Sequence, residues 1–184
     1  FLCEEHRKLA YEAAVKSFVL LKNEDAILPL SPNQKIAFIG PYTDSRDMLG
    51  SWSFTGGAET GEVKTVRAAA EEALDGWSVT YHIGCPVLDP GTVLEGFDRY
   101  KPSSATQEET ERWREEARKA AEEADVVVMP LGEHCFQSGE AASRAFIEIP
   151  KIQQDLFRAV SEVNPNVVAV VFSGRPLDLR VISE

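Results

Sequence analysis

The chain has 184 residues, with 19 Lys and Arg against 30 Asp and Glu, which gives a formal net charge of −11 at pH 7. This length suits one domain, and a composition that is 43% hydrophobic and 27% charged is ordinary for a globular fold. The acidic excess argues against nucleic acid and anionic membrane surfaces as partners, and no apolar run approaches the roughly 20 residues of a spanning helix.

The first half of the chain predicts two helices and two strands. Helix-forming residues favour a helix over Glu4–Ser17, and an apolar run predicts a brief strand over Phe18–Leu21. A buried strand is expected at Lys35–Ile39, followed by a polar, Gly-rich loop over 42–62. An Ala-rich pattern with a suitable capping residue then predicts a short helix over Thr65–Leu74.

The second half repeats the alternation. Polar and apolar residues alternate over Trp77–Ile83, as in a strand, and a charged, Ala-rich pattern predicts a helix over Glu108–Ala124. Asp125–Met129 reads as a strand that is buried on both faces. An amphipathic helix opened by Pro150 precedes a last apolar strand over Val167–Phe172.

Strands without polar alternation, separated by helices, indicate a parallel sheet that is covered on both faces. We therefore predict an α/β fold over residues 1–184, a three-layer αβα sandwich around a mostly parallel sheet. Both ends of the sequence look cut, so we expect the chain to be a piece of a longer polypeptide.

Ligands of such folds bind at the carboxyl ends of the strands, which directs attention to the loop over Gly132–Ile147. Glu133 follows a buried strand there, where its carboxylate could project into a crevice or simply be a solvated loop acid. Trp52, in the Gly-rich loop, could stack on a sugar ring or serve as a local packing anchor.

Other chemistries are less well supported by the motifs. The Gly-rich loop lacks the glycine spacing and Lys-Ser/Thr ending of phosphate-binding loops, and His134-Cys135 lacks the second ligand pair of a zinc site. A nucleophilic Cys135 would need a positioned histidine that no motif supplies. Three cysteines without regular spacing favour a reducing compartment, and with no leader pattern at Phe1 we expect a cytoplasmic location.

A series of motifs resembles the second domain of glycoside hydrolase family 3, in the variant found in bacterial β-glucosidases. They are, in order, Ala13–Asn23, Leu28-Pro29-Leu30, Lys35–Pro41, Leu49–Ser53, Ala124–Val128 with Gly132-Glu133, Ser138–Arg144, Asn164–Val168 and Phe172–Leu177. The resemblance covers nearly the whole chain. It implies a retaining exo-glycosidase whose preceding barrel domain, absent here, carries an Asp nucleophile, and whose sandwich domain runs further than this chain.

The same resemblance implies that Glu133 is the general acid/base, because it directly follows the strand-ending glycine. Glu140 is the rival carboxylate of the loop, and we expect it to order the loop through an ion pair with Arg144. Retaining glycosidases need two carboxyl groups about 5–5.5 Å apart, so the barrel and the sandwich must dock to complete the site. No metal or organic cofactor is expected.

The leading hypothesis is therefore the acid/base-bearing domain of a β-glucosidase-like hydrolase that acts on β-glucosides or oligosaccharides and is inactive without its barrel. The alternative is a non-catalytic module that binds carbohydrate or docks other domains. The sequence leaves the glycone, the linkage and the oligomeric state open, and a homodimer is compatible with it.

Overall fold

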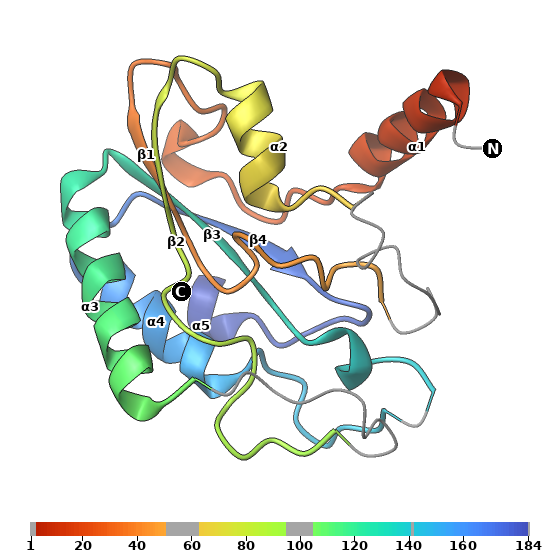
Figure 1. Ribbon diagram of the computed structural model, residues 1–184, viewed down its shortest axis with the longest axis vertical. Helices are drawn as coiled ribbons and strands as arrows, with labels where there is room; N and C mark the ends of the chain where they lie inside the picture. Colours follow the sequence, from red (N-terminus) through yellow and green to blue (C-terminus); the bar gives the residue numbers. More distant parts are fainter. Residues whose placement is uncertain (1–2, 51–62, 95–104, 141, 184) are drawn as a thin grey trace.

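A computed structural model of the chain describes residues 3–50, 63–94, 105–140 and 142–183. Its centre is a sheet of four parallel strands in the order β2-β1-β3-β4 (Figure 1). The strands are β1 (Lys35–Ile39), β2 (Ser78–His82), β3 (Val126–Gly132) and β4 (Val167–Phe172). Every pairing is parallel, from Lys35 opposite Ser78 to Gly132 opposite Phe172, which confirms the predicted sheet.

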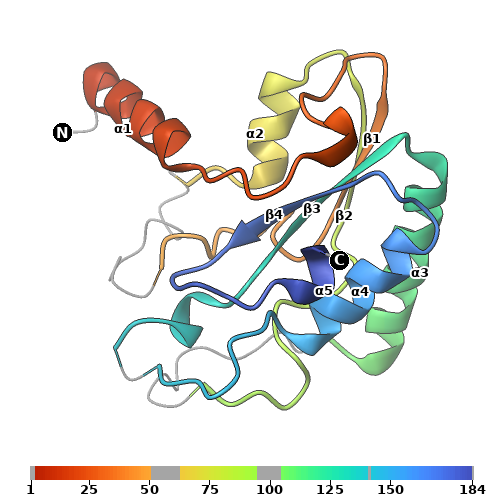
Figure 2. The same cartoon turned by 180° about the vertical axis from the view of Figure 1, so that it is seen from behind.

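Helices cover both faces of the sheet, so the fold is the expected three-layer α/β sandwich (Figures 1 and 2). One face carries α2 (Val66–Ala73). The other carries α3 (Gln107–Glu123), α4 (Lys151–Ser161) and the short α5 (Arg180–Ser183). Helices α2, α3 and α4 each connect two consecutive parallel strands, as crossover segments must.

Two apolar clusters fill the spaces between the layers. The larger lies under α3 and α4 and includes Ile39, Ala117, Ala121, Val127, Met129, Leu131, Ile152, Leu156 and Val160. The smaller lies under α2 and joins Ile36, Phe38, Ala70 and Val128. Each large aliphatic side chain buried in this way stabilises the fold by roughly 1.5–3 kcal/mol. The strands between them are rigid supports for the loops at their ends.

The helix starts follow from local hydrogen bonding. The Thr65 hydroxyl accepts a hydrogen bond from the Ala68 backbone N–H at 3.1 Å, which confirms the predicted cap of α2. Thr106 and Glu109 form a reciprocal capping box at the start of α3. These bonds satisfy donors that the first helical turn leaves without intrahelical partners.

Two expectations about strands were wrong. Phe18–Leu21 is not a strand; Phe18 is 75% exposed, and the run has no neighbouring strand to pair with among the described residues. Strand β3 does not end at Met129 but continues through Pro130 to Gly132. Proline is tolerated because the ladder to β1 ends at Val128, so the missing N–H is not needed on that side.

The first helix, α1 (Glu4–Ser17), has the predicted bounds but buries none of its residues. It projects away from the sheet in Figure 1, and the side chain of Leu9 is exposed. In the part of the chain that the structure describes, no helix is both long and apolar enough to cross a membrane.

Candidate active-site loop at the carboxyl edge of the sheet

The loops that follow β1 and β3 meet at the carboxyl edge of the sheet. The chain passes from β1 outward to β2 and then returns to the opposite side of β1 as β3, so the strand order reverses between β1 and β3. Such a reversal is where open α/β sheets bind ligands. The Tyr42 hydroxyl, from the loop after β1, donates a hydrogen bond to the Glu133 carbonyl at 2.6 Å and joins the two loops.

Two glycines, Gly40 and Gly132, allow the chain to leave the sheet in close contact with the backbone of the neighbouring strand. A Cβ on Gly40 would lie 2.4 Å from the Pro130 carbonyl oxygen, and one on Gly132 would lie 2.0 Å from that of Phe172. No side chain fits at such distances. The Gln153 side chain holds the Gly132 peptide from α4, accepting from its N–H at 2.9 Å and donating to its carbonyl at 2.8 Å.

The Glu133 carboxylate is the common acceptor of a buried polar cluster. Its side chain is 1% exposed. Oε2 lies 3.0 Å from Arg144 Nη1 and 3.6 Å from Arg175 Nε, while Oε1 accepts hydrogen bonds from the Ser173 hydroxyl and the Gly174 N–H, both at 3.1 Å. Burial of a carboxylate is costly unless donors and cations surround it in this way.

The two arginines extend the cluster to both ends of the loop. Arg144 Nη2 donates to the Glu148 carbonyl at 2.9 Å. Arg175 Nη2 donates to the Ala142 carbonyl at 2.7 Å and also to the Gln137 carbonyl. Glu133 and its partners therefore tie the segment after β4 to the loop after β3.

The expected ion pair between Glu140 and Arg144 was wrong, because Arg144 pairs with the buried Glu133 instead. Glu140 is exposed and follows Gly139, whose φ of 98° gives the backbone a turn that other residues rarely adopt. The loop also contains a short 3₁₀ turn, η3 (Cys135–Gln137), that the sequence did not predict. Trp52 lies outside the described residues, so its predicted role stays a prediction.

Asp47 and His134 form a second link between the loops, which sequence reasoning missed. His134 Nε2 lies 3.0 Å from Asp47 Oδ2, and His134 Nδ1 accepts from the Phe136 N–H at 3.2 Å. Burial lowers the pKa of His134, against the opposing effect of Asp47, so the imidazole is held neutral. Only proximity in space could have revealed a pair 87 positions apart in the chain.

Cys135 completes a group of potential metal ligands with Asp47 and His134, whose ligand atoms all lie within 4.8 Å of one another. Both ring nitrogens of His134 already face protein groups, an arrangement that suits a hydrogen-bonded pair better than a metal centre. Burial, followed by the neighbouring Asp47, raises the pKa of the Cys135 thiol well above its usual range. Such a thiol is a poor nucleophile.

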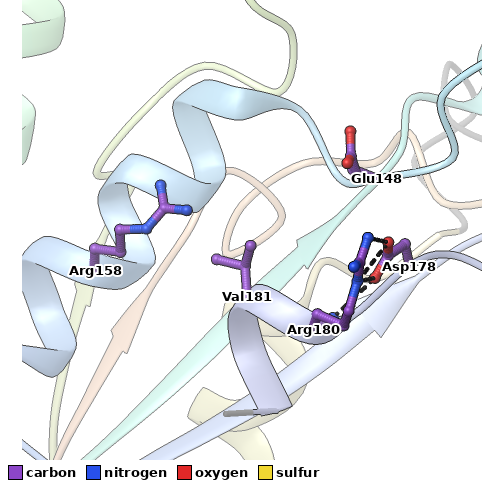
Figure 3. A pocket seen from close by; sticks show the side chains of 5 residues that line it. All are labelled: Glu148, Arg158, Asp178, Arg180 and Val181. Atoms are coloured by element: carbon purple, nitrogen blue, oxygen red, sulfur yellow. Dashed lines mark hydrogen bonds and ion pairs between the residues drawn. The ribbon is translucent and has the colours of Figure 1, made fainter.

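A cavity of about 300 Å³ lies between α4 and α5 and is shown in Figure 3. It is lined by Glu148, Arg158, Asp178, Arg180 and Val181. Both of its arginines are paired: Arg180 Nε lies 2.9 Å from Asp178 Oδ2, and Arg158 Nη1 lies 3.1 Å from Oδ1 of Asp155, which does not line the cavity. None of these five lining residues is aromatic, so the cavity offers no ring against which a sugar could stack.

Comparison with known proteins gives a consistent result. Residues 18–184 match the family model of the glycosyl hydrolase family 3 C-terminal domain. The periplasmic beta-glucosidase of Salmonella typhimurium is 38% identical over 177 residues, and a beta-xylosidase of Formosa agariphila is 28% identical over 187 residues. These alignments cover 95% and 98% of this chain, but only 23% of each relative.

Solved structures agree with this result. The crystal structure of the beta-glucosidase from Listeria innocua in complex with isofagomine superimposes with a TM-score of 0.79 at 30% identity. It covers 100% of this chain, which in turn covers 22% of that enzyme. The chain thus spans less than a quarter of the length of these relatives. With the matched family model and the shared fold, this chain belongs to glycosyl hydrolase family 3, as its C-terminal domain.

Proposed function

We propose that this chain is the acid/base-bearing domain of a retaining β-glycoside hydrolase of the glucosidase or xylosidase type. The observation that carries the proposal is the loop over 133–144 at the carboxyl edge of the sheet. The buried ion pair between Glu133 and Arg144 holds the two ends of this loop, and the loop presents an exposed carboxyl group at Glu140. The names of the relatives support β-glucosides and β-xylosides as the substrate class.

Two carboxyl groups of this loop compete for the role of general acid/base. Glu133 is the residue that the sequence predicted, but its carboxylate oxygens face Arg144, Ser173 and Gly174 and its side chain is 1% exposed. A general acid must come within hydrogen-bonding reach of the leaving oxygen. The contacts of Glu133 therefore favour Glu140, which is exposed in the same loop, as the group that reaches substrate.

In this proposal the two glutamates have different tasks. Glu140 protonates the leaving glycosidic oxygen and then removes a proton from the attacking water, while an Asp on a separate domain forms the glycosyl intermediate. Glu133 is a positioning residue that holds the base of the loop through Arg144. The chain alone is expected to be inactive because it lacks the nucleophile.

The exposed apolar surface of α1 and the residues after it supports a domain that functions within a larger enzyme. Phe18, Val19, Leu20 and Leu21 are all exposed, as is Leu9 on α1. Contiguous exposed apolar side chains are unfavourable in water and are typical of interaction surfaces. We propose that the preceding domain packs on them.

The test uses the complete enzyme and two variants, Glu140→Ala and Glu133→Ala. For Glu140→Ala we expect kcat on a substrate with a poor leaving group to fall by about 10²–10⁴, with a much smaller loss on dinitrophenyl glucoside. Azide should restore turnover and give the glycosyl azide. For Glu133→Ala we expect similar losses on both substrates, without rescue, and a lower Tm.

The opposite pattern, with azide rescue of Glu133→Ala, would return the acid/base role to Glu133. If both variants lost kcat equally on the substrate with a poor leaving group and on dinitrophenyl glucoside, the loop would not contain the general acid/base residue. The alternative, a non-catalytic module that binds carbohydrate or docks other domains, would then be favoured.

A further inference from the structure

The first turn of α4 contains a buried side chain that forms hydrogen bonds with two other segments of the chain. Gln153, in that turn, is 0% exposed. Its amide oxygen accepts from the Gly132 N–H at 2.9 Å, and its amide nitrogen donates to the carbonyls of Gly132 at 2.8 Å and Val87 at 2.6 Å. A primary amide has two donor hydrogens, so both are used. Gln153 therefore joins the end of β3 to the loop after β2.

Asp89 makes the reciprocal contact, from the loop after β2 to the start of α4. Its carboxylate oxygens accept from the Lys151 N–H at 2.9 Å and from the Ile152 N–H at 2.7 Å. The residue before the helix, Pro150, forms no side-chain hydrogen bond that could cap it. The first N–H groups of a helix lack intrahelical partners, and a carboxylate beside them is also favoured by the helix dipole. Asp89 therefore caps α4 from a position 62 residues before Lys151.

These contacts attach both ends of the segment that contains the 133–144 loop. The segment runs from the end of β3 to the start of α4. Gln153 holds its first end, at the last residue of β3, and Asp89 holds its last end, at the first turn of the helix. The ion pair of Glu133 with Arg144, by contrast, joins two points within the segment. The position of the loop on the scaffold therefore depends on Gln153 and Asp89 as well as on that ion pair.

The loop after β2 is itself closely packed against α4. Its residues Cys85 and Leu88 are buried. Cys85 belongs to the same apolar cluster as Leu156 of α4, and a Cβ on Gly84 would lie 2.6 Å from the Leu156 side chain. Close-packed interiors have few voids into which such groups could shift. This loop therefore gives α4, and the segment before it, a fixed support.

We propose that Gln153 and Asp89 are positioning residues for hydrolysis: they set where the 133–144 loop, and with it the acid/base carboxyl group, lies relative to the sheet. This role rests on the proposed function, because it exists only if that loop carries the acid/base. A misplacement of about 1 Å caused far from the reacting atoms can lower a rate about 10²-fold. Gln153 acts through the Gly132 peptide and Asp89 through the start of α4, so neither residue has to touch substrate.

The experiment measures kcat/KM of the complete enzyme on a substrate with a poor leaving group and on dinitrophenyl glucoside. Gln153→Met keeps the length of the side chain and removes its three hydrogen bonds. We expect it to lower kcat/KM about 10–100-fold on the first substrate and less than about threefold on the second, which needs little help from an acid. Asp89→Ala should give the same pattern with a smaller loss, and Asp89→Asn, which keeps one acceptor oxygen, should recover part of that loss.

The ratio of the two kcat/KM values separates positioning from stability. A purely structural role would lower the Tm and leave that ratio unchanged at temperatures well below the Tm. Gln154→Met is the matched control, because it makes the same change at the next position of α4, where the side chain donates to the Ile149 carbonyl at 2.8 Å. It should leave the ratio unchanged. If Gln153→Met does not fold, Asp89→Ala gives the same test at a half-buried position.

Hydrogen exchange, followed by mass spectrometry of the complete enzyme, reports how firmly the loop is held without any catalytic step. Amides of residues 132–137 should exchange about 10–100-fold faster in Gln153→Met than in the parent enzyme, because the Gly132 N–H loses its acceptor. In Gln154→Met their exchange should stay unchanged.

Two results would overturn the positioning role. They are unchanged exchange of residues 132–137 in Gln153→Met, and an unchanged ratio of kcat/KM in that variant although Glu140→Ala or Glu133→Ala changes it. A failure of the proposed function gives a different result, since neither glutamate variant would then change the ratio. The positioning role would fail with it, whatever the exchange rates.

Discussion

The substitution Glu133→Gln tests the buried cluster that holds the loop. It removes the negative charge that pairs with Arg144 and Arg175. The amide nitrogen of the new side chain would replace Oε2, so two hydrogen-bond donors would face each other where Arg144 Nη1 now lies 3.0 Å from an acceptor. The Gln oxygen can still accept from Ser173 and Gly174. Breaking a fully buried ion pair costs about 3–5 kcal/mol.

The two arginine side chains are 19% and 23% exposed, so water can hydrate them in part after the carboxylate is lost. We therefore expect Glu133→Gln to lower the free energy of unfolding by about 3 kcal/mol, at the lower end of that range. For a chain of this size that corresponds to a fall in Tm of about 6–12 °C. Circular dichroism melting, with urea unfolding as a second measure, is the assay. The ion pair is buried, so added salt should change the difference little.

Glu140→Gln is the matched control, because it makes the same chemical change at an exposed position of the same loop. Surface substitutions of this kind usually change stability by less than about 0.5 kcal/mol. If Glu133→Gln lowered the Tm no more than Glu140→Gln, the cluster would not hold the loop, and the assignment of Glu133 as a positioning residue would fail.

Three further predictions concern the scaffold. Gly132→Ala should lower the Tm by several degrees, as its Cβ would meet the Phe172 carbonyl at 2.0 Å; unchanged melting would contradict that contact. Leu156→Ala, at a fully buried position, should cost about 2–5 kcal/mol in urea unfolding. The pKa of His134 is lowered by burial, so the unfolded chain binds more protons and the unfolding free energy should fall as pH drops below about 6.5. His134→Gln should flatten that slope.

The sequence was informative about the scaffold because a strand that is buried on both faces consists of consecutive apolar residues, a pattern that can be recognised in the sequence. The uninterrupted apolar run at Val126–Met129 and the amphipathic helices predicted a covered parallel sheet, and the structure has it. The same signal misled at Phe18–Leu21, where an apolar run lies exposed. Hydrophobic residues show that burial is favourable, but not which surface buries them.

The site was less predictable, because its contacts join distant parts of the chain. Glu133 and Arg144 were both identified as site residues, but the pairing expected from nearby positions placed Arg144 on Glu140. The true environment of Glu133 includes Ser173, 40 positions away, and loop residues have no periodicity from which such contacts follow. Asp47 was not predicted as a site residue, because its contact with His134 also joins distant parts of the chain.

The glycines Gly40 and Gly132 have a consequence for how this fold can vary. Each one presses its backbone against the carbonyl of a neighbouring strand, so the point at which each loop departs is fixed by the sheet and not by the loop. Loop length and chemistry beyond that point can therefore change without a shift of the strands. For protein engineering, we therefore expect that a relative's loops can be grafted after these two glycines, with Tyr42 and Glu133 kept, while the layered framework stays intact.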